Sequence, residues 1–293
     1  MTNIGSPQGD SASAILFILY LAISLSLLLK SGSSTIDHTY NIKADQHIVI
    51  DQQYADDIGW ASTTSEDIEK VEDTVPQILK DRNLYVNESK TEKYTIERNG
   101  SHEWKTCKYV GSLLDTEKDI KRRKALANNA YASVKNVYSN REISLETKLR
   151  IHNALIESIF LYNCEVWTLT KKHEREIDIF QRILLRRTLG IRWSDKVTNE
   201  ELYEKTKDKK WSEKVIKRRI SWFGHLARLP ESCPAKQALY EALKPVKRPR
   251  GRPQITWIEI IRKQLKNIGF DTIYDAIESA RDRYNWNKIV NKL

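Results

Sequence analysis

The chain has 293 residues, of which 40% are hydrophobic and 30% are charged. This composition excludes a disordered chain and fits a protein with a buried core, arranged as one large domain or as two to three small ones. The formal net charge of +10 and the pI of about 9.3 favour polyanionic partners such as nucleic acid.

The first apolar segment is "SAILFILYLAISLSLLLK", in which residues 14–29 carry no charge. It is just short of the ~20 residues that span a bilayer. A secretory signal has basic residues before its apolar run, whereas here Asp10 precedes the run and no basic residue does. The segment therefore predicts a buried core helix and makes a membrane partner the less favoured reading, while a protein anchored through residues 14–29 remains an alternative.

The next segment, "QHIVIDQQYADDIGWAS", has strand-forming residues on both sides of Asp56 and Asp57. This pattern predicts a hairpin with the two carboxylates at its turn. Adjacent carboxylates repel each other, and a divalent cation such as Mg²⁺ offsets that repulsion because it takes oxygen ligands. Nucleotidyl-transfer sites use such groups to hold two metals ~3.5–4 Å apart. Asp is also common in exposed turns, so a turn without chemistry is the alternative.

The segment "TTSEDIEKVEDTVPQILKDRN", residues 63–83, predicts a helix, because apolar side chains recur at helical spacing from Ile68 to Leu79 behind a Thr or Ser cap. Pro76 lies inside this pattern and predicts a kink or two short helices. The segment "NLYVNESKTEKYTIERNG" returns to strand character, with a turn at 99–100 before "EWKTCKYVGSLL".

From Asp115 onward the sequence predicts an almost wholly helical region. "KPVKRPRGRPQ", residues 244–254, predicts a loop or linker, and two closing helices follow in "ITWIEIIRKQL" and "IYDAIESARDRYNW". Three apolar stripes mark the earlier helices: Leu145, Leu149, His152, Ile156 and Ile159; Ile177, Phe180, Leu184 and Thr188, ending near Gly190; and Trp211, Val215, Ile220, Phe223 and Leu226.

The positive charge is concentrated between Lys171 and Gly251, which contain 22 basic and 11 acidic residues. A charge run is often only a solvated face. Here aromatic residues alternate with the basic ones, which favours nucleic-acid binding. These aromatic residues are Trp193, Trp211, Trp222 and Phe223.

Three cysteines, Cys107, Cys164 and Cys233, lie more than fifty residues apart. Their odd number and wide spacing predict reduced thiols in an intracellular protein, cytoplasmic or nuclear and not secreted. The chain has no C-x-x-C motif, and His225 with Cys233 is too sparse a pair for a zinc site, so no zinc is expected.

Several short motifs together resemble the palm of reverse transcriptases, most closely those of non-LTR (LINE-type) retrotransposons. In chain order they are the glycine turn "GSPQGD", the apolar helix, "YADD", "NESKTE" and "YVGS". Later segments look like the thumb and carboxy-terminal region of the same proteins: "RRKALANNAYASV", "KLRIHNALIESIFLYNCEVWTLTK", "QRILLRRTLGIRW", "RRISWFGHLARLP" and "RGRPQITWIEII".

The resemblance implies RNA-directed DNA synthesis with Mg²⁺ or Mn²⁺, on an RNA template and a DNA primer. It implies that Asp56 and Asp57 bind the metals and that Lys90 assists the leaving pyrophosphate. It also implies that Gln8, Gly9, Tyr54 and Gly111 border the nucleotide or the template and primer. The basic segment is expected to contact phosphates while its apolar residues pack, through Arg186, Arg187, Lys217, Arg218, Arg219, Arg248, Arg250 and Arg252.

The expected fold is α+β: a partial polymerase palm of antiparallel hairpins packed on helices over residues 1–113, followed by a mostly α-helical thumb and carboxy-terminal region. The thumb-like region is expected at 114–205 and the basic helical region at 206–293. In this family a strand with another metal-binding aspartate, together with the fingers, precedes the glycine turn. Neither stands before Gly5 in this sequence, so the chain alone is expected to be inactive. A non-catalytic nucleic-acid-binding remnant is the main alternative.

Overall fold

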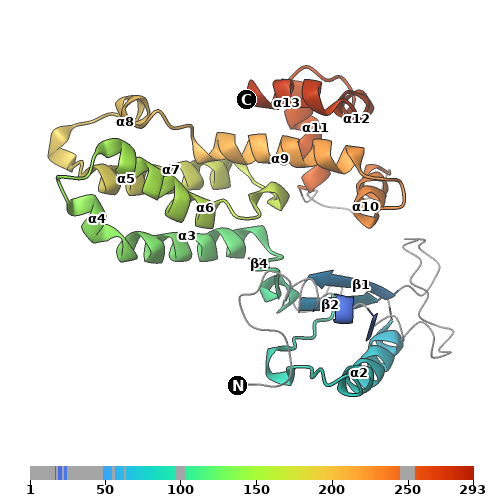
Figure 1. The fold of residues 1–293 in the computed structure, drawn as a ribbon. Coiled ribbons are helices and arrows are strands. Elements are labelled where there is room, and N and C mark those ends of the chain that lie inside the picture. Colours follow the sequence, from blue (N-terminus) through green and yellow to red (C-terminus); the bar gives the residue numbers. More distant parts are fainter. Residues whose placement is uncertain are drawn as a thin grey trace. The chain divides into compact units, whose positions relative to one another are not determined.

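The computed structural model describes residues 17, 19–21, 23–24, 49–54, 57–62, 64–96, 103–244 and 255–293. The chain divides into two compact units, which are described one at a time (Figure 1). The amino-terminal unit is Met1–Gly111, and the carboxy-terminal unit is Ser112–Leu293.

The amino-terminal unit contains the predicted hairpin. Strand β1 (Val49–Tyr54) pairs antiparallel with β2 (Asp57–Ser62), in a register that sets Val49 opposite Ser62 and Tyr54 opposite Asp57. The prediction of a hairpin around the aspartate pair is therefore confirmed.

Helix α2 (Ser65–Lys80) follows the hairpin and is continuous through Pro76, so the prediction of two short helices is wrong. Proline removes only one backbone hydrogen bond, whereas the apolar stripe buries side chains along the whole length of the helix. These side chains are Val71, Val75 and Leu79, which form a core with Leu21, and Ile58 and Trp60 of β2 pack against it.

A short helical stretch near residue 20 belongs to the same core. Leu21 is buried, and the Tyr20 hydroxyl donates to the Arg82 carbonyl at 2.7 Å. The core-helix prediction for residues 14–29 is confirmed at Leu21, whereas Leu19 and Ile23 are exposed. Most of that segment lies outside the described residues. Of the part of the chain that the structure describes, no helix combines the length and the apolar character needed to cross a bilayer.

Residues 84–96 are irregular apart from a 3₁₀ turn, η1 (Glu88–Lys90), so the strand predicted there is wrong for these residues. β-propensity depends on packing against a neighbouring strand, and Tyr85 and Ile96 are exposed here and not packed on a sheet. The predicted turn at 99–100 lies outside the described residues. A 3₁₀ turn, η2 (Glu103–Thr106), and the two-residue strand β3 (Lys108–Tyr109) end this unit.

The carboxy-terminal unit begins with the short strand β4 (Ser112–Leu113) and is otherwise helical in its described residues, as predicted. Its regular elements are α3 (Thr116–Ser133), α4 (Lys135–Ser139), α5 (Leu145–Ile151), the π-helical turn η3 (His152–Glu157), α6 (Ser158–Phe160), the 3₁₀ turn η4 (Cys164–Val166), α7 (Lys171–Leu189), the 3₁₀ turn η5 (Trp193–Asp195), α8 (Asn199–Thr206), α9 (Trp211–Arg228), α10 (Pro234–Leu243), α11 (Trp257–Asn267), α12 (Ile273–Ala280) and α13 (Arg283–Asn291).

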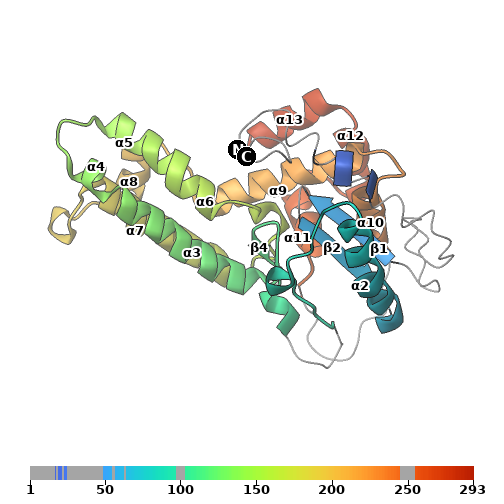
Figure 2. The ribbon, with the colours of Figure 1, turned by 60° about the horizontal axis from the view of Figure 1, so that its bottom comes forward.

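Helix α9 joins two hydrophobic cores in this unit. Its first half packs with α3, α6 and α7 through Trp211 and Val215, and its second half packs with α10 to α13 through Ile220 and Phe223. Figures 1 and 2 both draw α3 beside α7, with α9 running from this group toward α11 and α13. The apolar stripe predicted for α9 is therefore confirmed.

The ends of two helices show how local sequence sets the boundaries. Helix α7 ends at Gly190, whose left-handed φ of 67° is easy for glycine, as its sequence predicted. Three helices close the chain, whereas the sequence predicted two. Asp282 accounts for the extra boundary, because its carboxylate accepts the backbone N–H groups of Tyr284 and Asn285 and starts α13.

Candidate functional site

The end of the β1–β2 hairpin carries the predicted catalytic motif. Tyr54 closes β1 and Asp57 opens β2, so the two residues stand opposite each other at the last pair of the ladder. Both are exposed, Tyr54 to 63%. Asp56 lies in the two-residue connection, outside the described residues. The hairpin therefore presents Asp57 to solvent on a short, regular scaffold.

Side chains alternate between the two faces of β2. Ile58 and Trp60 pack toward the core of the unit, so Asp57 and Gly59 belong to the opposite face. The Tyr109 ring covers Gly59 on that face: a Cβ at position 59 would stand 3.1 Å from Tyr109 Cε2. The structure thus brings the "YADD" and "YVGS" motifs together. Burial, and after it the charge of Asp57, raise the pKa of the Tyr109 hydroxyl above its ordinary value.

The backbone after Tyr109 turns sharply. Val110 and Gly111 both have positive φ angles, 43° and 77°. Two consecutive positive φ values are typical of the tightest hairpin turns. Glycine adopts them easily, but a β-branched valine is strained there. The sequence reasoning singled out Gly111 and missed Tyr109, although its place two residues before this glycine is a usable signal.

Of the remaining residues of the predicted catalytic set, the structure describes Lys90. Lys90 is exposed in η1 and forms no ion pair with any described residue, and Gln8 and Gly9 lie outside the description. The described residues hold no group of three or more His, Cys, Asp or Glu side chains arranged for a metal. Asp57 fits Mg²⁺ by its chemistry, because its carboxylate is exposed and outside any ion pair in the described part of the chain.

Several arginines of the basic segment point into the protein. Arg219 is 1% exposed and donates to the Trp167 carbonyl at 2.7 Å, and burial lowers its pKa to about 10. Arg218 donates to the Leu161 carbonyl at 2.8 Å. The expectation that these arginines are free for phosphates is therefore wrong for Arg219. Its guanidinium satisfies a backbone carbonyl of the core instead.

Lys214 is also used internally. Its ammonium lies 2.5 Å from both Glu157 Oε2 and Asp208 Oδ1, and Glu157 Oε2 also accepts the Trp211 indole N–H at 2.9 Å. The two carboxylates neutralise the positive charge of Lys214. Trp211 itself is fully buried in the core.

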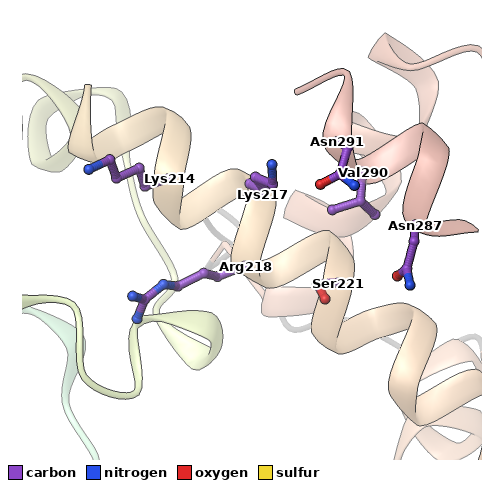
Figure 3. A pocket seen from close by; sticks show the side chains of 7 residues that line it. All are labelled: Lys214, Lys217, Arg218, Ser221, Asn287, Val290 and Asn291. Carbon is purple, nitrogen blue, oxygen red and sulfur yellow. The ribbon is translucent and has the colours of Figure 1, made fainter. Parts of the chain in front are cut away.

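A groove of about 320 Å³ lies between α9 and α13. Figure 3 shows Lys214 and Arg218 directed away from the residues of α13. Lys217 is the lining cation without a hydrogen bond or ion pair to another described residue. The groove is lined by Lys214, Lys217, Arg218, Ser221, Asn287, Val290 and Asn291.

The remaining predicted cations and aromatic residues differ in exposure. Arg187 is exposed, while the Arg186 guanidinium donates to Val197 O at 3.3 Å and Asn199 Oδ1 at 2.9 Å. Arg248, Arg250 and Arg252 lie outside the described residues. Among the aromatic residues of the segment, Phe223 is buried with Trp211, whereas Trp222 is 36% and Trp193 96% exposed.

Comparison with known proteins gives one match. Residues 1–114 match the family described as reverse transcriptase (RNA-dependent DNA polymerase). No curated protein and no solved structure matches the chain. The matched range contains the hairpin and the turn at Val110 and Gly111, and it ends at the third residue of the carboxy-terminal unit.

Proposed function

We propose, from the family match over residues 1–114, that this chain derives from the reverse transcriptase of a non-LTR retrotransposon and that its hairpin is the metal-binding end of a polymerase palm. The observation that carries the proposal is the hairpin register, which sets Asp57 opposite Tyr54 at an exposed end of the ladder. Mg²⁺ would be held by the Asp56 and Asp57 carboxylates. When bound, it would activate a primer hydroxyl and stabilise a leaving pyrophosphate.

Metal binding is measured independently of polymerisation. We expect titration with Mn²⁺, followed by electron paramagnetic resonance, to reveal binding that weakens at least tenfold in Asp57→Asn. Asp73→Asn is the matched control, because Asp73 is an exposed aspartate on α2. Equal binding by the wild-type chain and Asp57→Asn would contradict the proposed metal site.

Primer extension on an RNA template tests the reaction itself. The sequence-based expectation for residues 1–293 alone is extension at the background level. Extension that disappears in Asp56→Asn and persists in Asp73→Asn would instead establish polymerisation by this chain.

A second function, nucleic-acid binding without catalysis, is supported by the charge of residues 171–251 and by the exposure of Arg187. Binding of this kind weakens steeply with salt because phosphate contacts release counterions. We expect RNA or DNA binding that survives Asp56→Asn. Binding that is independent of salt would contradict this function.

An intracellular location is proposed on the state of the cysteines. Cys107, Cys164 and Cys233 are all free thiols, and Cys164 is buried. Free thiols are usual in reducing compartments. Fractionation of cells that express the tagged chain would test the proposal, and recovery in the medium would contradict it.

A further inference from the structure

Trp193 is the most exposed large apolar side chain among the described residues, at 96%. It stands in η5, between α7 and α8. A single exposed apolar residue is common on protein surfaces and carries no meaning by itself. What distinguishes Trp193 is the way its loop is built.

The loop is fixed at both of its ends. At its start the Ile191 N–H donates to the Arg186 carbonyl at 2.9 Å, closing the end of α7. At its end the Arg186 guanidinium donates to Val197 O and Asn199 Oδ1. One arginine therefore connects the two ends of the loop, which limits the conformations available to the residues between them.

The middle of the loop is closed by its own hydrogen bonds. The Arg192 N–H donates to Asp195 Oδ2 at 2.7 Å, and the Lys196 N–H donates to the Trp193 carbonyl at 3.3 Å. The second of these bonds uses the Trp193 carbonyl, and neither involves the Trp193 ring. Within the described ranges the indole makes no ring contact and no hydrogen bond. The loop therefore fixes the backbone that carries Trp193 and does not use its indole for folding.

Basic residues flank Trp193 in the sequence. Residues 182–199 contain five basic residues and one acidic residue, Asp195. The Asp195 carboxylate accepts the backbone N–H of Arg192. Arg187, Arg192 and Lys196 are exposed. A presented aromatic ring with cations beside it is the arrangement that binds single-stranded nucleic acid, because bases stack on the ring and phosphates meet the charges.

We propose that Trp193 is a stacking platform for an unpaired base of a single-stranded nucleic acid, with Arg192 and Lys196 contacting the flanking phosphates. The proposal rests on the nucleic-acid binding proposed above and adds the class of ligand and the residue that distinguishes single strands from duplexes. A duplex offers its bases already stacked, so the indole gains little there.

The experiment measures fluorescence anisotropy of a labelled 12-nucleotide oligouridylate and of a labelled RNA duplex with the full chain. We expect Trp193→Ala to weaken single-strand binding roughly tenfold, to change duplex binding less than about twofold and to leave the salt slope unchanged. Trp193→Phe should restore most of the affinity. Lys196→Gln should lower the salt slope by about one. Tyr274→Ala is the matched control, because Tyr274 is 62% exposed beside Asp271 and Asp275 and is expected to bind nothing.

The outcomes separate the two proposals. If the wild-type chain binds neither probe, the nucleic-acid function fails and the platform fails with it. If the wild-type chain binds and Trp193→Ala binds the single strand equally well, only the platform is wrong. The platform is also wrong if Trp193→Ala weakens binding of the single strand and of the duplex equally. It is likewise wrong if Trp193→Ala loses binding to a partner protein while its RNA binding is unchanged. Urea unfolding checks the fold of each variant, and quenching of wild-type tryptophan fluorescence by oligouridylate that is absent from Trp193→Phe provides a second readout.

Discussion

The two units differ in where their charged side chains lie. In the amino-terminal unit Asp57 and Lys90 are exposed, and the apolar residues beneath the hairpin form the core. In the carboxy-terminal unit Arg219 is buried among apolar residues and Lys214 is held between two carboxylates. Part of the positive charge of the carboxy-terminal unit therefore lies on side chains that are buried or ion-paired within the protein.

This difference shows that a motif and a charge count carry different information. The spacing in "YADD" reflects a local geometry, and the hairpin reproduces it. A count of basic residues does not say whether their side chains face solvent or the core, because a long side chain can turn inward and donate to a carbonyl. Arg219 does so toward Trp167, 52 positions away in the sequence.

The largest expected effect concerns the core of the carboxy-terminal unit alone. A Cβ at position 224 would overlap the Trp286 indole, which is fully buried and donates to the Ile220 carbonyl. We expect Gly224→Ala to displace this ring and to lower the free energy of unfolding by about 3–5 kcal/mol, as loss of a buried tryptophan does. Urea denaturation measures it, with Ser221→Ala, an exposed position on the same helix, as the control. Limited proteolysis within α2 should be unchanged, because α2 packs in the core of the amino-terminal unit. Faster cleavage there would contradict an effect confined to the carboxy-terminal core.

A pH effect of nearly the same size should arise from His152. Burial lowers the pKa of this fully buried side chain from 6.5 to about 4, with Asp208 opposing and Lys214 adding to the shift. The folded state therefore excludes a proton that the unfolded chain binds below pH ~6.5. The contribution of neutral His152 to the free energy of unfolding is fully present above that pH. It falls by about 3 kcal/mol as the pH approaches 4.

Unfolding in urea at several pH values measures this loss. His152→Asn should reduce the pH dependence between 6.5 and 4 while the carboxylates titrate as before. An identical pH dependence in the variant would show that the buried imidazole is not its source.

Two arginine variants compare a buried cation with an exposed one. Arg219→Met should cost about 1–3 kcal/mol of stability, because the Trp167 carbonyl loses its donor, and it should leave the salt slope of RNA binding unchanged. Arg187→Gln should change stability by less than about 0.5 kcal/mol and lower the salt slope by about one. The reverse pattern would show that Arg219, and not Arg187, reaches the phosphate.

The smallest expected effect lies in the amino-terminal unit. Gly59→Ala places a methyl group against Tyr109, and we expect a loss of about 1 kcal/mol. Tyr109→Leu in the same chain should recover part of it. A double-mutant cycle by urea unfolding measures the coupling, and simple additivity would mean that the two side chains do not meet in solution.

Elements with strong local signals could be predicted from the sequence. The stripe through Trp211, Val215 and Ile220 fixed α9, and Gly190 fixed the end of α7. The failures depended on surroundings that a single segment does not contain. Residues 84–96 have strand-forming side chains without a sheet to pack on, and Pro76 is tolerated because the packed stripe holds α2 together.

The candidate site likewise has features that its local sequence predicts and features that depend on packing. The "YADD" hairpin follows from alternation and turn residues that are close in sequence. Its contact with Tyr109 joins residues 50 positions apart, and nothing in either segment alone specifies it. The burial of Arg219 and the exposure of Trp193 likewise depend on how the helices pack, which the composition of the basic segment does not reveal.

The glycine beneath the Tyr109 ring has a consequence for how this protein can change over evolutionary time. A Cβ at position 59 would stand 3.1 Å from Tyr109 Cε2, so a side chain there requires the tyrosine ring to shift. A larger residue at position 59 is therefore expected to be tolerated better when position 109 carries a smaller side chain than tyrosine. Substitutions at the two positions are therefore expected to be correlated among related sequences.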